Sequence, residues 1–391
     1  MAILSTLHII TGLEDGGAEA VLYRLCMHDA ANRHQVISLM DSGKYGPMLK
    51  SLGVPVTCLH MPRGRVTAKG LWRLWRLIRA QKPDVVQTWM YHANLLGGVA
   101  ARLAGSRKVV WGIRHGDLSD EGTSWRTFSV MKLGAWLSDW IPQRIICCAE
   151  KSRDVHIAEG YASDRITVVP NGYDMSAFRP DANMRNAVRA ELGISDYEEV
   201  IGFVGRYDPQ KDHDNLLQAL RLLKNLGRRP ICLLVGTGME EENKVLARQI
   251  NDLGLSKCVR LLGRRNDIPK VMNALDLHVM SSAFGEAFPN VLSEAMACGT
   301  PCISTNVGDA ELIVGDTGWI VPTRNSEALA EAISEALDAR ARPNWAMRQE
   351  AARLRVESSF SIERMVNSYR AVWVGDDTDS FAARVTHRGG C

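Results

Sequence analysis

Two glutamates, Glu286 and Glu294, are separated by seven residues in a segment that also contains Pro289. Proline favours the first position of a helix, and the later Gly299 and Pro301 favour its end. We therefore predict a helix that begins near Pro289, with Glu286 in the loop before it. Glu294 would then lie roughly 7 to 8 Å further along the helix axis, at about 1.5 Å per residue. The two carboxylates are too far apart to act as one acid–base pair.

The start of this predicted helix offers groups that bind a charged, hydroxylated ligand. Backbone N–H groups at a helix start have no partner within the helix and attract anions such as a diphosphate. The N–H groups that we assign to the diphosphate lie near Phe288, Pro289, Asn290 and Val291, and Ala287 beside them is a further donor-binding residue. Glu286 can accept hydrogen bonds from sugar hydroxyls, and Glu294 from a ribose diol. The alternative, a helix with one capping glutamate and another on its polar face, is disfavoured because glycine, proline and acid occur together at its start.

Two cations, Arg206 and Lys211, follow an apolar run near the middle of the chain. Cations at the mouth of a cleft can neutralise a diphosphate and stabilise it as it leaves. Taken alone, they fit ordinary solvated side chains of a surface loop equally well.

A glycine-rich turn containing Gly16 and Gly17 follows the first apolar run and precedes a helical pattern. Glycines at this place let backbone N–H groups approach a phosphate at the positive end of a helix. The spacing is not that of the G-x-G-x-x-G fingerprint, so a plain tight turn is the alternative interpretation.

Short β-branched runs alternate with longer amphipathic stretches, a pattern typical of parallel sheets covered by helices on both faces. The alternation pauses in a mostly polar stretch at residues 178–197 and then restarts. Because 391 residues exceed what one core usually serves, we predict two α/β domains, at residues 1–180 and 181–360. Each is a Rossmann-like, doubly wound sheet, and the two face a central cleft where ligands meet the carboxyl ends of the strands. The expected strands are residues 3–10, 35–39, 85–88, 109–113, 144–148, 166–169, 200–204, 231–235, 259–262, 277–280, 302–304 and 319–321.

Taken in order, these motifs resemble those of the retaining glycosyltransferases of family 4, which have the GT-B fold. Glu286 and Glu294 resemble the family's Glu-x7-Glu region, and residues 168–172 resemble its approach to the hinge. The resemblance covers nearly the whole chain. It implies that residues 361–373 form a helix that crosses back to the first domain, and that residues 374–391 form a tail.

The resemblance also implies roles for single residues. It assigns the diphosphate to Arg206 and Lys211, the donor sugar to Glu286 and the ribose to Glu294, with Gly16 and Gly17 in the family's glycine loop.

His115 matches the family's histidine beside the reacting sugar. The family often has aspartate directly after that histidine, whereas here the aspartate is displaced by one position to Asp117. A lone histidine at a strand end is otherwise usually a structural residue.

The activity implied is transfer of a hexose-type sugar from a UDP- or GDP-sugar to a hydroxyl of a saccharide or lipid-linked saccharide, in surface polysaccharide biosynthesis. Transfer would proceed with retention at the anomeric carbon, while the departing diphosphate takes the acceptor proton on the same face. No cofactor and no metal are implied. Two alternatives stay open: a catalytically silent partner that binds sugar nucleotides, and another GT-B enzyme such as an epimerase.

The first 180 residues hold 22 Lys and Arg against 15 Asp and Glu, although the whole chain has a formal net charge of only +3. Four of these cations, Arg73, Arg76, Arg79 and Lys82, lie on one side of a predicted helix at residues 69–82. A basic helix with tryptophans can lie on an anionic membrane surface. The favoured alternative is an amphipathic crossover helix with a solvated arginine face.

The remaining features point to a cytoplasmic protein, with a peripheral position on the inner face of the membrane as a further expectation. The N-terminus lacks the basic region of a signal peptide, and the longest uncharged stretch is too short and polar to span a bilayer. Nine cysteines without a C-x-x-C pair indicate reduced core thiols. Mild basicity of this kind does not argue for a nucleic-acid partner.

Overall fold

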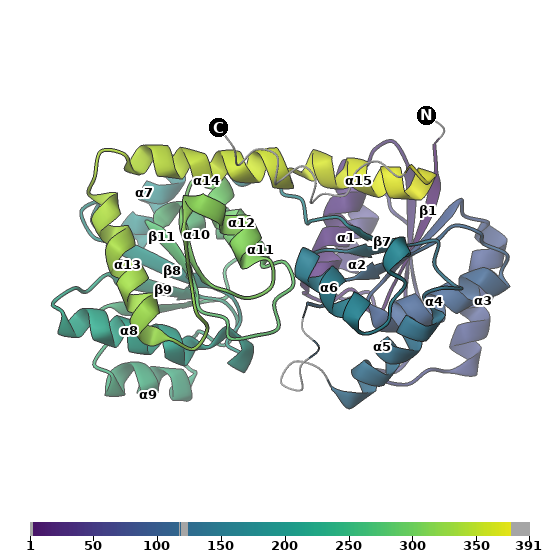
Figure 1. The fold of residues 1–391 in the computed structure, drawn as a ribbon, viewed down its shortest axis with the longest axis horizontal. Helices are drawn as coiled ribbons and strands as arrows, with labels where there is room; N and C mark the ends of the chain where they lie inside the picture. The colour runs from purple at the N-terminus through teal and green to yellow at the C-terminus, as the bar shows by residue number, and fades with distance from the viewer. Residues whose placement is uncertain (1–2, 117, 119–123, 377–391) are drawn as a thin grey trace. The chain divides into compact units, whose positions relative to one another are not determined.

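The computed structural model describes residues 3–116, 118 and 124–376, in which the chain forms two compact units (Figure 1). The first unit runs to Gly172 and resumes at Ile362, and the second unit is Tyr173–Ser361. Each unit contains one parallel sheet with helices on both faces. The α/β, doubly wound fold predicted from the alternating pattern is therefore confirmed.

The sheet of the first unit has seven parallel strands in the order β3-β2-β1-β4-β5-β6-β7. They are β1 (Ser5–Ile10), β2 (Arg33–Ser38), β3 (Val56–Cys58), β4 (Val85–Trp89), β5 (Val109–Ile113), β6 (Arg144–Cys147) and β7 (Ile166–Val168). The helices are α1 (Gly17–His28), α2 (Tyr45–Ser51), α3 (Ala68–Gln81), α4 (Tyr91–Leu103), α5 (Trp125–Leu137), α6 (Glu150–Ala158) and α15 (Ile362–Val374). The order reverses between β1 and β4, which marks the topological switch point of this sheet.

Apolar side chains cover both faces of the first sheet. On one face, Leu74 of α3 and Met131 of α5 are buried in the same cluster as the strand residues. On the other face, Leu22 of α1 packs with Tyr369 and Trp373 of α15. The last helix therefore belongs to the core of the first unit, although it is the last element of the chain.

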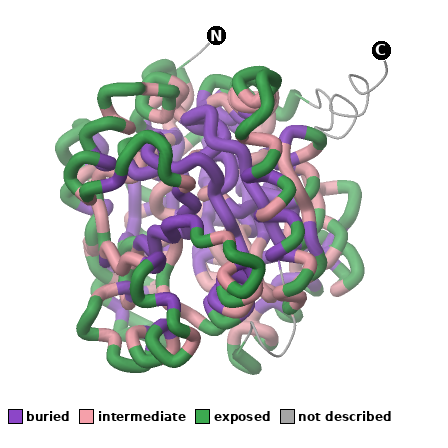
Figure 2. The backbone as a smooth tube through the Cα atoms, turned by 90° about the vertical axis from the view of Figure 1, so that its left-hand side faces the viewer, coloured by how far each residue is buried: buried purple, intermediate pink, exposed green. Residues whose placement is uncertain are grey.

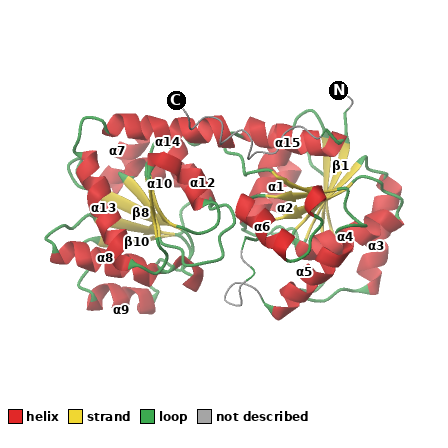
Figure 3. Cartoon of the chain, in the orientation of Figure 1, coloured by secondary structure: helices red, strands yellow, loops and turns green. Residues whose placement is uncertain are grey.

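The second unit has six parallel strands in the order β10-β9-β8-β11-β12-β13, with helices between them along the chain (Figure 3). They are β8 (Val200–Val204), β9 (Ile231–Val235), β10 (Val259–Gly263), β11 (Leu277–Met280), β12 (Cys302–Thr305) and β13 (Trp319–Val321). The helices are α7 (Ala182–Glu191), α8 (His213–Asn225), α9 (Lys244–Asp252), α10 (Ile268–Ala274), α11 (Asn290–Ala297), α12 (Ala310–Val314), α13 (Ser326–Arg340) and α14 (Trp345–Phe360).

The core of the second unit lies between its sheet and the helices α8, α9 and α13. Leu217, Leu246 and Ile333 from these three helices join the strand residues Ile201 and Val279 in one buried cluster. Figure 2 shows the buried backbone of the chain, in purple, and the exposed backbone, in green.

The structure ends the first unit at Gly172, whereas the sequence suggested a boundary at residue 180. The backbone N–H of Tyr173 donates to the Phe360 carbonyl at 2.9 Å, and Tyr173 forms a β-bridge with Ser361. Arg353 donates to the carbonyl of Phe178 at 3.1 Å. These bonds tie residues 173–178 to the second unit, and the sequence pattern gave no sign of them.

The sequence pattern missed strand β3. It placed β2 and β4, the strands before and after it in the chain, to within two residues at each end. β3 has only three residues, lies at the edge of the sheet and carries Thr57 at its centre, so it lacks the apolar run that identified the other strands. In the described parts of the chain, no helix has both the length and the apolar character needed to cross a membrane.

Candidate active site

The carboxyl ends of β8 and β11 carry the two loops in which the sequence placed its strongest candidates. These strands are neighbours, and the strand order reverses between them, so their loops leave the sheet side by side. Arg206 and Lys211 lie in the loop after β8, and Glu286 lies in the loop after β11. The backbone N–H of Ala283 donates to the Gln210 carbonyl at 2.8 Å, which joins the two loops directly.

Lys211 and Glu286 form an ion pair across these loops. Lys211 Nζ lies 2.5 Å from Glu286 Oε1, and the two side chains are only 15% and 11% exposed. The Ser282 hydroxyl donates to the same Oε1 at 2.9 Å. A mostly buried carboxylate thus has a cation and a hydroxyl as partners, which is the arrangement that makes burial of a charge tolerable. Both residues could be predicted from the sequence, but their pairing could not.

Arg206 is the exposed cation of the site. Its side chain is 62% exposed and its Nε donates to Asp208 Oδ2 at 3.0 Å. Partial burial acts to raise the pKa of Asp208, but the hydrogen bonds from the Gln210 N–H and the Arg206 guanidinium outweigh it, and the pKa is lowered. Asp208 therefore stays ionised and holds Arg206 at the mouth of the loop.

Helix α11 begins one residue later than the sequence predicted. Asn290 is its first residue, and Pro289 is the N-cap with φ −70° and ψ 97°, in the extended region. In the described part of the chain, no side chain caps this helix start. Glu294 is the fifth residue of the helix, and it is partly buried. The backbone groups of this start remain suited to an anion.

Two glycines allow the loop before α11 to pack closely on its neighbours. Gly285 has φ +78°, and a Cβ there would lie 2.9 Å from the Gln210 side chain. Gly308 has φ +55°, and a Cβ there would lie 2.4 Å from the Ala287 carbonyl oxygen. Both positions combine a left-handed backbone with a close contact, so larger residues there would displace the loop.

Two buried histidines lie near Lys211. Burial, together with the positive charge of Lys211, lowers the pKa of His213 to about 4 and that of His278 to about 3. The ring of His213 also packs at a tilt against the rings of Phe203 and Tyr207, with centroids 4.7 and 5.0 Å away. Both histidines are therefore neutral near pH 7, and sequence reasoning had singled out neither.

The other predicted site residues, Gly16, Gly17 and His115, lie in the first unit. Gly16 is the N-cap of α1, and among the described residues no side chain caps this helix start. A Cβ on Gly16 would lie 2.3 Å from the Glu19 carboxylate. The missing side chain thus makes room for an acidic group at this helix start. The phosphate that the sequence placed at Gly16 and Gly17 stays a prediction.

His115 follows β5, and its carbonyl accepts a hydrogen bond from the Ser152 hydroxyl at 2.7 Å. Its ring lies edge-on to Tyr91, with centroids 6.1 Å apart. The neighbouring Arg114 donates to Asn171 Oδ1 at 2.5 Å, so the loop is held at Arg114 and at His115 itself. Asp117, which the sequence placed beside His115, lies outside the described residues.

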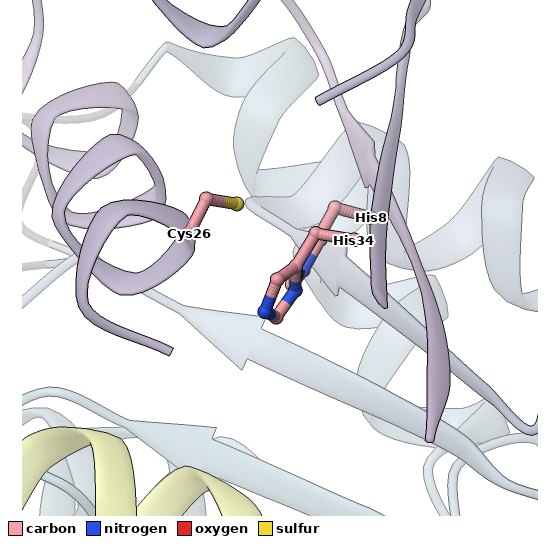
Figure 4. Close-up of side chains that lie close together, drawn as sticks. All are labelled: His8, Cys26 and His34. Carbon is pink, nitrogen blue, oxygen red and sulfur yellow. Dashed lines mark hydrogen bonds between the residues drawn. The ribbon is translucent and has the colours of Figure 1, made fainter. Parts of the chain in front are cut away.

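His8, Cys26 and His34 form a buried cluster whose potential ligand atoms lie within 4.8 Å of one another (Figure 4). Trp89 Nε1 donates to His8 Nδ1 at 3.2 Å, so His8 carries its proton on Nε2 and donates to His34 Nδ1 at 2.9 Å. The nitrogens that would face a metal are therefore bonded to each other. Burial lowers the pKa of His8 and raises that of Cys26, which keeps both neutral. The cluster fits a structural hydrogen-bond network better than a metal site.

The sequence matches two family models, one described as "Glycosyltransferase Family 4" over residues 15–177 and one as "Glycosyl transferases group 1" over residues 184–354. The UDP-Gal:alpha-D-GlcNAc-diphosphoundecaprenol alpha-1,3-galactosyltransferase of Escherichia coli is 30% identical over 298 residues, which cover 74% of this chain and 75% of that protein. The putative glycosyltransferase EpsF of Bacillus subtilis is 28% identical over 349 residues, 84% of each chain. The crystal structure of Anabaena HepE in complex with UDP has a TM-score of 0.83 and 24% identity, and the alignment covers 95% of this chain and 100% of that one.

We predict that acid destabilises the protein through His213 and His278. Unfolded histidines titrate near 6.5, whereas the folded values lie near 4 and 3, so below pH 6.5 the unfolded chain binds protons that the folded chain does not. Stability should fall as the pH drops from 6.5 toward 4, by about 2 kcal/mol per histidine at pH 5.

The test is urea unfolding of the wild type and of His213→Phe at pH 7 and pH 5. The phenylalanine keeps a ring between Phe203 and Tyr207 and should remove about 2 kcal/mol of the loss between the two pH values. His60→Gln is the control, because that side chain is 69% exposed. An equal loss in the wild type and in His213→Phe would contradict this account.

Proposed function

The chain belongs to the family 4, group 1 glycosyltransferases, and from that membership we propose that it transfers a hexosyl group from a UDP-sugar to a hydroxyl of a lipid-linked saccharide. The Escherichia coli relative, by its name, takes UDP-galactose and a diphosphoundecaprenol-linked GlcNAc, which supports UDP-galactose as the first donor to test and surface polysaccharide synthesis as the setting. The observation that carries the proposal is the Lys211–Glu286 pair, in which Glu286 lies in the loop that leads into α11.

The diphosphate of the donor lies at the start of α11 and contacts Arg206 and Lys211. The helix start supplies backbone N–H groups, and Arg206 supplies an exposed guanidinium suited to phosphate oxygens. Glu294, inside the same helix, accepts hydrogen bonds from the ribose diol, and Glu286 accepts them from hydroxyls of the transferred sugar. A UDP-sugar presents these three groups in that order.

Transfer proceeds with retention. The bond between the anomeric carbon and the diphosphate oxygen breaks with both electrons moving to the oxygen, while the acceptor oxygen bonds to the anomeric carbon on the same face. The acceptor proton passes to the departing diphosphate. Glu286 stabilises the positive charge that develops on the sugar, Arg206 and Lys211 stabilise the negative charge on the diphosphate, and His115 contacts the reacting sugar.

The reaction runs without a metal or cofactor. The role that a divalent cation plays at the diphosphate elsewhere, neutralising developing charge, falls here to two side-chain cations and a helix start. Arg206 and Lys211 lie in the loop after β8, and the start of α11 follows the loop after β11, which supports this proposal.

The enzyme works at the inner face of an anionic membrane, which it touches with the helices of its first unit. Arg73, Arg76 and Arg79 are exposed on α3, and Trp72 beside them is 54% exposed. Three tryptophans at or near the ends of α5 add apolar surface: Trp125, Trp136 and Trp140 are 73%, 70% and 75% exposed. Cations and tryptophans together are typical of surfaces that lie on anionic bilayers.

The proposed activity is tested by incubating the purified protein with radiolabelled UDP-galactose, with and without a diphosphoundecaprenol-linked GlcNAc acceptor. We expect slow hydrolysis without the acceptor and faster transfer with it, both unchanged in EDTA. A protein that binds UDP-galactose but never cleaves it would be the silent partner instead. Activity lost in EDTA and restored by magnesium or manganese would contradict metal independence.

The roles of the two glutamates predict different defects. Glu286→Gln keeps the shape and an acceptor for Lys211 but removes the charge, so turnover should fall about tenfold or more while UDP affinity changes little. Glu294→Ala should weaken UDP binding roughly 10- to 100-fold, since a hydrogen bond to a charged group contributes roughly 1.5 to 3 kcal/mol. Glu331→Ala, at an exposed position of α13, is the control. Equal loss of UDP affinity in both variants would disprove this division.

Membrane binding is tested by co-sedimentation with vesicles of anionic lipid at low and high salt. Three arginines near such a surface contribute about 1 kcal/mol each, so the wild type should bind at low salt and dissociate at high salt. Arg73, Arg76 and Arg79 changed together to Glu should abolish binding and leave donor hydrolysis intact. Arg221, Arg229 and Arg248 changed together to Glu make the same charge change at exposed positions of the second unit and should bind nearly as the wild type does.

If the α3 variant binds as well as the wild type, while Trp136 and Trp140 changed together to Ser abolish binding, then α5 alone is the contact. If the wild type ignores anionic vesicles, the membrane proposal fails.

A further inference from the structure

The amino end of the α11 helix is held by a tyrosine at the very start of the second unit. The Tyr173 hydroxyl donates to Asn290 Oδ1 at 2.5 Å, and Tyr173 is fully buried. Asn290 is the first residue of α11. A hydrogen bond to its amide oxygen fixes the plane of this side chain at the helix start, which is where the diphosphate is proposed to bind.

The carboxyl end of the same helix is held by an arginine that also binds the stretch at residues 173–178. The Arg353 guanidinium, on α14, donates to the carbonyl of Ala297, the last residue of α11, at 2.5 Å. It also donates to the carbonyls of Phe178 at 3.1 Å and Met175 at 3.3 Å. Tyr173 therefore binds the amino end of α11, and Arg353, which also binds residues 175 and 178, binds its carboxyl end.

A third contact joins the loop before α11 to the segment by which the chain leaves the unit. The rings of Phe288 and Phe360 meet edge to face, with centroids 5.3 Å apart. Phe360 in turn accepts the backbone N–H of Tyr173 at 2.9 Å, and Tyr173 forms a bridge with Ser361. The segment at Tyr173, where the chain enters the unit, thus pairs with the segment at Phe360 and Ser361, where it leaves. Helix α11 and the loop before it contact both segments.

We propose that Tyr173 is a positioning residue for the donor site: through Asn290 it orients the start of α11, so that the phosphate-binding N–H groups keep one direction. This role rests on the function proposed above. An eight-residue helix is too short to be stable by itself, so its orientation is set by its tertiary contacts. Tyr173 and Arg353 supply two of these contacts, one at each end.

The test compares UDP affinity, measured by calorimetry, in Tyr173→Phe, Asn290→Ala and the double variant. Tyr173→Phe removes one oxygen and keeps the ring, and we expect it to weaken UDP binding three- to tenfold and to raise the donor KM more than it lowers kcat. Because both single changes break the same hydrogen bond, the double variant should bind UDP no more weakly than Asn290→Ala alone.

Tyr161→Phe is the matched control. Tyr161 is also buried, and its hydroxyl donates to the Met131 carbonyl at 3.2 Å in the first unit. Both tyrosine variants should lower the melting temperature to a similar extent, but only Tyr173→Phe should weaken UDP binding. Wild-type UDP affinity in Tyr173→Phe, or additive losses in the double variant, would overturn the positioning role alone. A wild type that binds no UDP would overturn the proposed UDP-dependent function, and this role with it.

Discussion

The buried ion pair between Lys211 and Glu286 constrains everything else at the carboxyl edge of the second sheet. Either charge without the other would be mostly buried and unpaired, which would lower the free energy of unfolding by several kcal/mol. The pair therefore requires the loops after β8 and β11 to stay in contact. Two hydrogen bonds also join these loops. The Ala283 N–H donates to the Gln210 carbonyl at 2.8 Å, and the Ser281 hydroxyl donates to the Lys211 carbonyl at 2.9 Å. Two loops that are distant in sequence become one surface.

In the donor site proposed above, the same pair would determine how a diphosphate and a sugar share this surface. A lone glutamate beside a diphosphate would repel it, but Glu286 is balanced by Lys211, and Arg206 is balanced by Asp208. The nearby His213 and His278 add no charge, because burial and the charge of Lys211 keep them neutral. An arriving anion therefore meets a nearly neutral edge, where the helix start and the exposed Arg206 provide the positive potential. If it draws Lys211 toward itself, Glu286 gains freedom to accept bonds from sugar hydroxyls.

Much of the fold could be predicted because buried parallel strands are unbroken apolar runs. The runs at Val109–Ile113, Val200–Val204 and Ile231–Val235 match strands to the residue. The short edge strand β3 has no such run and was missed. Candidate residues in the loops could be named because ligands of these sheets meet the strand ends. Their partners could not, since the Lys211–Glu286 and Tyr173–Asn290 contacts join residues far apart in sequence, and only the order of the strands brings them together.

Helix α11 shows why a motif and its placement are separate problems. The sequence identified the helix and both glutamates, and its start was wrong by one residue because Pro289 can serve as N-cap as well as first residue. What the helix does, however, depends on the direction in which its first N–H groups point. That direction is set from outside the motif, by Tyr173 at one end and by Arg353 at the other. A ligand that binds the helix start therefore acts on the segments by which the chain enters and leaves the unit, because those segments hold the helix in place.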